Sequence, residues 1–191
     1  MSPGGVTGRE EAMRDWNVVV TVREGGFVPA CRLLEPYGLV KKSEFFNILT
    51  MRADDPRWLL VELHRQLAGS TAIAGWIARF MPLERFFTFQ APGEFETHAR
   101  DAVSAWLPRL AGRSFHVRMH RRGFKGKMSS MEEERLLDTF LLERLAEAGT
   151  PGRLVFDDPD GIITVETLGT RCGLALWERQ ELARFPLLHL D

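Results

Sequence analysis

The chain has 191 residues, a formal net charge of -1, 45% hydrophobic residues and 27% charged residues. This composition is typical of a globular protein of one or two domains, and it argues against a surface that is positive all over. Two cysteines, Cys31 and Cys172, are too few for a disulfide framework and lack the paired spacing of a metal site. The chain shows neither a secretory signal nor an apolar run that could span a bilayer. We therefore expect a cytoplasmic protein without membrane attachment.

The first half of the chain predicts a domain of alternating strands and helices. Residues 1–14 are expected to form a loose tail. Strands are expected where β-branched and aromatic residues cluster, and helices where apolar residues recur every three or four positions. The expected elements are strand 16–23, helix 27–37, strand 45–52, helix 56–69, helix 71–81 and strand 83–89. This order predicts a ferredoxin-like domain over residues 15–90, with helices on one side of an antiparallel sheet.

The second half predicts a further α/β domain over residues 91–191. A break in composition at Ala91-Pro92-Gly93 marks the expected boundary. The expected elements are helix 95–110, which Pro108 should kink or end, strand 113–120, helix 131–148, and two antiparallel strands, 162–168 and 172–177, on either side of Gly169. We expect a mixed or antiparallel sheet, so that the whole chain belongs to the α+β class.

The stretch 113–127 carries the strongest functional signal. Apolar and polar side chains alternate up to residue 120, as in a strand with one buried face, and a turn with Gly123 and Gly126 follows. The stretch contains no acidic residue, although the chain as a whole is nearly neutral. Arginine side chains match phosphate oxygens in shape, and glycines allow a ligand to approach the backbone. The candidate phosphate-binding residues are Arg118, His120, Arg121, Arg122, Lys125 and Lys127.

Recognisable catalytic or cofactor motifs are lacking. The sequence has no Walker A sequence, no G-x-G-x-x-G after a strand and no His-Glu-x-x-His. His116 and His120 share a strand face, where they would lie roughly 13 Å apart, too far to bind one ion. Cys172 is interpreted as a small buried hydrophobe rather than a thiolate activated by Arg171. The acidic clusters are interpreted as helix-capping and turn residues: Glu132, Glu133, Glu134, Asp157, Asp158 and Asp160. We therefore predict no catalytic residue, no metal site and no cofactor.

Three segments resemble the THUMP family of RNA-binding domains. Residues 114–123, followed by a helix that opens near Glu132, match one motif of that family. Residues 159–166 resemble the family's segment of Pro-Asp, hydrophobic strand and Glu, and residues 79–82 resemble its Arg-x-x-Pro. The resemblance covers the second half of the chain well and the first half more loosely, and the order and spacing of the segments make it specific.

The resemblance implies binding of tRNA near its acceptor end, with the six basic residues contacting phosphates. Members of the family usually carry a ferredoxin-like domain and a catalytic domain for methylation, thiolation or deamination, and this chain has room for the first alone. We expect a stand-alone, non-catalytic form, similar to an adaptor that presents tRNA to a separate modifying enzyme such as a cytidine acetyltransferase. Two alternatives stay open: a tRNA-modifying enzyme with an unrecognised active site, and a protein-interaction module that does not bind RNA.

Overall fold

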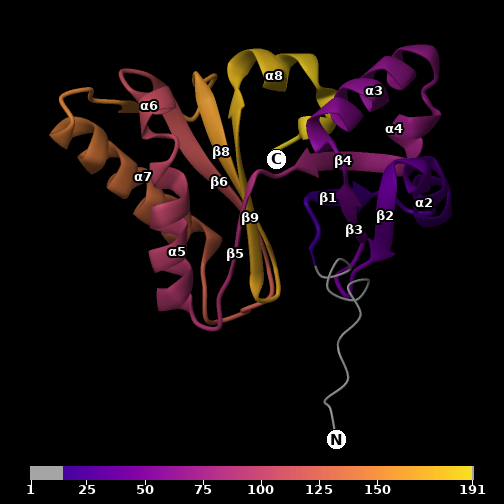
Figure 1. Cartoon of the computed structure of the whole chain (residues 1–191), viewed down its shortest axis with the longest axis horizontal. Helices are drawn as coiled ribbons and strands as arrows, with labels where there is room; N and C mark the ends of the chain where they lie inside the picture. The colour runs from indigo at the N-terminus through magenta and orange to yellow at the C-terminus, as the bar shows by residue number, and fades with distance from the viewer. Residues whose placement is uncertain (1–14, 191) are drawn as a thin grey trace, which may run out of the picture. The chain divides into compact units, whose positions relative to one another are not determined.

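The chain folds into two compact units, each built around its own sheet (Figure 1). The computed structural model describes residues 15–190, so the predicted loose tail at residues 1–14 lies outside the described residues. The first unit contains the chain up to Leu83 together with Phe185–His189, and the second contains Glu84–Arg184 together with Leu190. One sheet is antiparallel and the other is mixed, which confirms the α+β class.

The first unit contains a four-stranded antiparallel sheet in the order β2-β3-β1-β4. Its elements are β1 (Val18–Val22), α2 (Phe27–Leu34), η1 (Glu35–Tyr37), β2 (Gly38–Lys42), β3 (Ile48–Ala53), α3 (Pro56–Gly69), α4 (Ala72–Trp76) and β4 (Ile77–Pro82), with η2 (Pro186–Leu188) added from the end of the chain. Helix α3 begins as predicted, because Asp55 accepts a hydrogen bond from the Trp58 N–H at 2.9 Å and Pro56 occupies the first turn.

Two predictions for the first unit are wrong. Strand β2 lies in a stretch for which no element was expected, and residues 77–82 form β4 instead of the end of a helix. The residues of β4 are buried on both faces, so the segment lacks the alternation that identifies a half-exposed strand. Its pairing with β1 joins residues far apart in the sequence, and local spacing of apolar residues does not reveal it.

The second unit contains a five-stranded mixed sheet in the order β5-β9-β8-β6-β7. Its elements are β5 (Arg85–Thr88), α5 (Pro92–Ser104), α6 (Leu107–Leu110), β6 (Ser114–Arg122), α7 (Ser130–Glu147), β7 (Arg153–Leu154), β8 (Gly161–Leu168), β9 (Arg171–Glu178) and α8 (Arg179–Arg184). Strand β6 runs parallel to β8 and β7, whereas β8 and β9 form the predicted antiparallel pair. The helix expected at 95–110 is interrupted between Ser104 and Leu107, and Pro108 lies in the first turn of α6 rather than at the break.

The two units divide between Leu83 and Glu84, earlier than the predicted boundary after residue 90. Strand β5 pairs with β9, so the strand expected at 83–89 belongs to the second sheet and not to the first. The Pro-Gly break that suggested a linker is the first turn of α5, where proline is well tolerated. The segment Phe185–His189 also departs from the predicted division, because it returns to the first unit.

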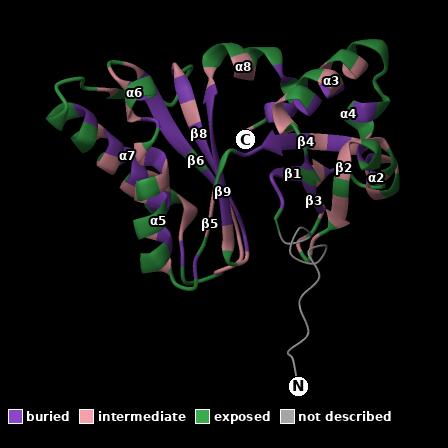
Figure 2. Cartoon of the chain, viewed as in Figure 1, coloured by how far each residue is buried: buried purple, intermediate pink, exposed green. Residues whose placement is uncertain are grey.

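Helices α5 and α7 contribute buried stripes to the core of the second unit. The large core residues include Phe95, Val103, Phe115, Val117, Leu137, Leu141, Ile163 and Val165. Figure 2 shows β6, β8 and β9 buried along most of their length, with exposed residues along α5 and α7. Among the helices of residues 15–190, none combines the length and apolar character needed to cross a membrane.

Candidate nucleic-acid interface

The predicted basic stretch lies at the carboxyl end of a parallel strand pair. Strands β6 and β8 run side by side from Phe115 opposite Gly161 to Arg122 opposite Leu168, and α7 lies between them in the chain. In a β-α-β unit of this kind, the carboxyl ends of the strands and the N-terminus of the helix meet at the same end, where ligands commonly bind. The loop 123–129, which joins β6 to α7, occupies this end.

Lys125 and Lys127 are exposed on a loop whose apolar residues are anchored. The ring of Phe124 lies 5.0 Å from that of Phe89, and Met128 is buried. The carbonyl of Phe124 accepts hydrogen bonds from the N–H groups of Lys127 and Met128 at 3.0 and 3.1 Å. Both ammonium groups are therefore carried by a fixed turn, which lowers the entropy lost when they bind a ligand.

The lack of a side chain at Gly123 allows two loops to pack closely together, and it is not needed for a ligand to approach the backbone. A Cβ atom at Gly123, whose φ is +98°, would lie 3.0 Å from the Cα of Gly169 in the turn between β8 and β9. The N–H of Gly169 also donates to the carbonyl of Arg122 at 2.9 Å. By contrast, a Cβ at Gly126 would meet no atom within 4 Å among the described residues, so the backbone there is accessible.

Two of the six predicted residues, His120 and Arg122, share a buried carboxylate. Glu166 on β8 is fully buried, and its Oε2 accepts a hydrogen bond from Arg122 Nη1 at 2.7 Å. Its Oε1 lies 3.2 Å from Nδ1 of His120. This carboxylate compensates part of the positive charge, so Arg122 has a structural role whether or not it also contacts RNA. Reversing Arg122 to glutamate would place two carboxylates together and is expected to destabilise the unit.

Arg118 and Arg121 point to opposite faces of β6, because successive side chains of a strand alternate. Arg118 is exposed, and its Nε donates to the carbonyl of Leu190 at 3.0 Å. Arg121 is half-buried on the face of Phe115, and its guanidinium donates to the carbonyl of Gly123. The six predicted residues therefore do not form one row. Lys125, Lys127 and Arg118 are exposed, and the other three are partly enclosed.

Carboxylates from α7 close the outer edge of β6. Strand β7 pairs with only the first two residues of β6, Ser114 and Phe115. Beyond them, the N–H of Val117 donates to Asp138 Oδ1 at 2.8 Å, and the N–H of Met119 donates to Glu134 Oε1 at 2.7 Å. Acidic side chains therefore cover this edge of the basic strand.

Two buried carboxyl groups on α7 resist ionisation. Burial raises the pKa of Asp138 to about 7, although the hydrogen bond from Val117 lowers it. Burial, followed by the charges of Glu96 and Glu132, raises the pKa of Glu133 to about 7. Glu133 was interpreted as a capping residue, but the cap of α7 is Ser129, which accepts from the Glu132 N–H at 3.4 Å.

Asp138→Asn should make the protein more stable at pH 8 by at least about 2 kcal/mol. The folded protein holds the Asp138 proton more strongly than the unfolded chain, where Asp titrates near about 4. Stability therefore falls as the pH rises from about 4 to about 7, and asparagine removes this loss while its carbonyl still accepts the Val117 N–H.

Urea unfolding at several pH values provides the measurement. The two proteins should become equally stable as the pH falls toward 4, and Asp101→Asn, the same replacement at an exposed position of α5, is the control. If Asp138→Asn were less stable than the parent at both ends of the range, the ionised carboxylate would be required by the fold.

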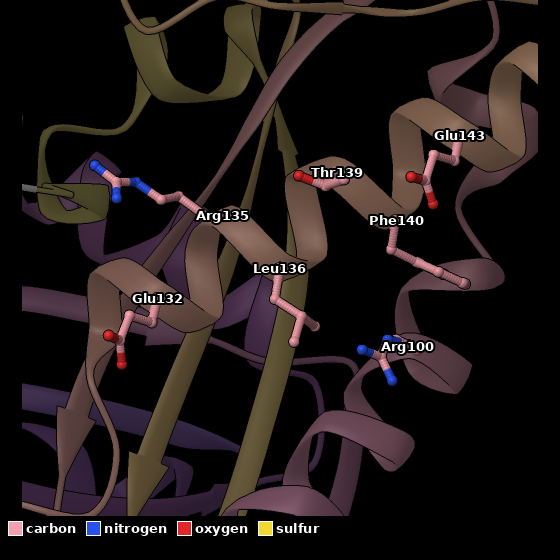
Figure 3. A pocket seen from close by; sticks show the side chains of 7 residues that line it. All are labelled: Arg100, Glu132, Arg135, Leu136, Thr139, Phe140 and Glu143. Atoms are coloured by element: carbon pink, nitrogen blue, oxygen red, sulfur yellow. The ribbon is translucent and has the colours of Figure 1, made fainter.

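A hollow of about 540 Å³ on the outward side of α7 is lined by both acidic and basic side chains. Figure 3 shows its lining, with Arg100 from α5 beside Phe140 and with Glu132, Arg135 and Glu143 along α7. Arg135 extends away from Arg100 in this view, so the two guanidinium groups do not converge. The hollow therefore lacks the convergent positive charge that a phosphate site requires.

The sequence-based list omitted Arg171, which lies at the same end of the sheet as Arg122. In the register of the sheet, Leu168 stands opposite both Arg122 on β6 and Arg171 on β9. The guanidinium of Arg171 lies 4.9 Å from the ring centroid of Phe86, a cation–π arrangement. Arg171 was weighed only as an activator of the neighbouring cysteine, and no local pattern places it beside the basic stretch.

The structure gives the remaining chemical groups structural roles. Cys172 is fully buried, and burial raises the pKa of its thiol well above the usual value. Asp160 accepts hydrogen bonds from the N–H and hydroxyl of Ser114, both at 2.8 Å, which lower its pKa. Across residues 15–190, no three His, Cys, Asp or Glu side chains gather in a way that suits a metal ion.

Solved structures share this architecture at low sequence identity. PH1313 from Pyrococcus horikoshii has a TM-score of 0.52 and 12% identity, and the match covers 84% of this chain and 54% of that protein. TrmN from Thermus thermophilus has a TM-score of 0.53 and 17% identity, with coverage of 84% and 44%. A 4-thiouridine synthetase in complex with RNA and ATP has a TM-score of 0.52 and 20% identity, with coverage of 86% and 42%.

These likenesses establish a shared fold. No protein-family model and no curated protein matches the sequence. The chain spans roughly half the length of each of the three proteins above, so the remainder of each has no counterpart in the match. The chain therefore shares the fold of a part of proteins that include an RNA-bound 4-thiouridine synthetase.

Proposed function

We propose that this chain is a non-catalytic tRNA-binding protein that presents the acceptor region of tRNA to a separate modifying enzyme, such as a cytidine acetyltransferase. The observation that carries the proposal is the pair of exposed lysines, Lys125 and Lys127, on an anchored turn at the carboxyl end of β6. The fold shared with a 4-thiouridine synthetase solved with RNA supports it. We assign the second unit to the THUMP-like arrangement on the sequence motifs and on this shared fold.

We also assign the first unit to the ferredoxin-like arrangement. Apart from the short η1, α4 and η2, its elements follow the order β-α-β-β-α-β, and its antiparallel strands have the order β2-β3-β1-β4. This order agrees with the split β-α-β pattern that defines the arrangement. The pairing of a ferredoxin-like unit with a THUMP-like unit is what the sequence resemblance implies.

In this proposal, recognition rests on the phosphate backbone and on the shape of the RNA. Base edges are poorly accessible in an A-form helix, so basic side chains contact phosphates and hydroxyl groups instead. Lys125 and Lys127 make the main contacts, and Arg118 extends the positive surface. Arg121, Arg122 and His120 contribute less, because each is partly enclosed and has a partner in the protein.

The proposed absence of catalysis is supported by the roles of the acidic and thiol groups near β6. Glu134 and Asp138 accept backbone hydrogen bonds, Glu166 pairs with Arg122, and Cys172 is buried. Incubation of the purified chain with tRNA, followed by mass spectrometry of the nucleosides, tests this point. A nucleoside modified by the chain alone would establish an enzyme. Loss of one modification in a strain that lacks the chain would identify the partner pathway.

The affinity for tRNA should depend steeply on salt. Neutralisation of about four phosphates predicts a slope of roughly -3 to -4 for log K against log salt concentration. Fluorescence anisotropy of labelled tRNA over a series of salt concentrations measures this slope. Affinity that does not change with salt would contradict a phosphate-based interface, and failure to bind tRNA at low salt would contradict the proposed function as a whole.

A further inference from the structure

A groove beside α7 combines exposed apolar side chains with an acidic floor. It has a volume of about 450 Å³, a size within the range of sites that accept ligand groups. Its apolar lining comes from α7, from β7 and from the segment after β7. The residues that matter for its chemistry are Met131, Glu134, Asp138, Leu142, Leu154 and Phe156.

The apolar wall of the groove is unusually open to solvent. Phe156 is 70% exposed, Met131 is 57% exposed and Leu154 is 38% exposed. The ring of Phe156 nevertheless has a defined position, because it lies 5.3 Å from the ring of His116, and Nδ1 of His116 lies 2.9 Å from the carbonyl of Val155. A cluster of large, positioned and exposed apolar side chains is typical of a surface that binds a partner.

The floor of the groove offers hydrogen-bond acceptors from Glu134 and Asp138 and the negative charge of Glu134, and a cation bound there would also favour the ionised form of Asp138. Glu134 and Asp138 lie one helical turn apart on α7, and each uses one carboxylate oxygen to accept an N–H of β6. A carboxylate has further acceptor capacity on its second oxygen. Arg135 is the one basic side chain among the lining residues, and it is exposed. Charge complementarity therefore calls for a ligand that is cationic and a hydrogen-bond donor.

We propose that this groove docks a segment of a partner protein in which an arginine or lysine lies between apolar residues. The cationic head group meets the carboxylate of Glu134 and the carboxyl group of Asp138, which gives up its proton more readily beside a cation, and its aliphatic stem and neighbours pack on Phe156 and Met131. Nucleic acid fits the groove less well, since its phosphates would face the carboxylate of Glu134 and would oppose ionisation of Asp138. Neither Lys125 nor Lys127 is among the residues that line the groove, so the inference does not depend on tRNA binding.

Selection of random short peptides displayed against the full chain tests the proposal. We expect enrichment of sequences in which arginine or lysine is flanked by leucine, methionine or aromatic residues. The affinity of the best peptide, measured by calorimetry, should fall at least about tenfold for Glu134→Gln with Asp138→Asn, and for Phe156→Ser. The Gln and Asn side chains keep a carbonyl oxygen for the N–H groups of β6, so these replacements preserve the strand edge.

Glu143→Gln is the matched control, because Glu143 lies on the same helix but outside the groove. It should leave the affinity for the peptide unchanged. Enrichment of acidic peptides, equal effects of the control, or failure to recover a peptide that depends on Phe156 would overturn the proposal. Two other occupants have their own signatures: a short RNA whose binding is lost in Phe156→Ser, or self-association of the chain that Phe156→Ser abolishes in sedimentation. Either result would replace the proposed partner.

Discussion

Replacing Lys125 and Lys127 together by glutamate should weaken tRNA binding by roughly 100-fold near physiological salt. Each replacement removes one favourable phosphate contact and adds one repulsive charge on the anchored turn. The slope of log K against log salt should also become shallower by about two, because two fewer counterions are released. Both side chains are exposed, so the fold should be retained. Anisotropy titrations with labelled tRNA measure both quantities.

Arg144→Glu with Arg153→Glu provides a control of equal charge. Each replacement in either pair changes the charge by -2, so both double variants move the net charge of the chain from -1 to -5. Arg144 lies near the end of α7 and Arg153 in β7, which pairs with the start of β6, at the opposite end of that strand from loop 123–129. The control should bind far more tightly than the lysine variant. Equal losses in the two variants would indicate a diffuse electrostatic effect and contradict a localised interface.

The elements of the second unit could be predicted because each carries its own signals. Helix α7 begins after Ser129, whose side chain caps it, and its stripe of Leu137, Leu141 and Leu145 is buried as the spacing indicates. Strands β8 and β9 were recognisable as neighbours because a glycine turn separates two apolar runs. These elements could be identified from local sequence patterns, because the residues that define each of them are close together in the sequence.

The division into units could not be predicted, because it depends on pairing between distant residues. Strand β5 joins β9, and Arg85 lies opposite Leu174, a partner that no local feature near residue 90 reveals. The apolar run of β4 was also hard to assign from the sequence, because a fully buried strand and a buried helix have similar compositions. The Pro-Gly break at 92–93 was expected to mark the start of a domain. It marks instead the start of helix α5, which lies inside the second unit.

The candidate site was predicted only in part, again because residues distant in the sequence contribute to it. The stretch 113–127 contains no acidic residue, yet three carboxylates reach β6 from elsewhere in the chain. Glu134 and Asp138 bind its outer backbone edge, and Glu166 pairs with Arg122 from the neighbouring strand. A stretch of sequence without acidic residues can therefore still have acidic side chains around it in the folded protein. The exposed lysines escape this compensation, because their loop extends beyond the last paired residues of the sheet.

Glu166→Gln should destabilise the second unit by about 3 kcal/mol. The replacement keeps the size of the side chain but removes the negative charge that pairs with Arg122, whose side chain is 19% exposed. A guanidinium left without its buried counter-charge costs far more than a surface ion pair gains. Hydrogen exchange of the β8 amides reports the stability of this unit directly, and should become faster by roughly 100-fold if these amides exchange through unfolding of the unit.

A double-mutant cycle separates the pair from the packing around it. Arg122→Met alone should also destabilise the unit, because it leaves the fully buried Glu166 with less compensation. Combined with Glu166→Gln, the loss should be smaller than the sum of the two single losses by at least about 1 kcal/mol. Strict additivity would show that the two side chains are not coupled. Arg122 would then be available to RNA to the same extent as Lys125, and its reversal to glutamate would be expected to weaken binding without loss of stability.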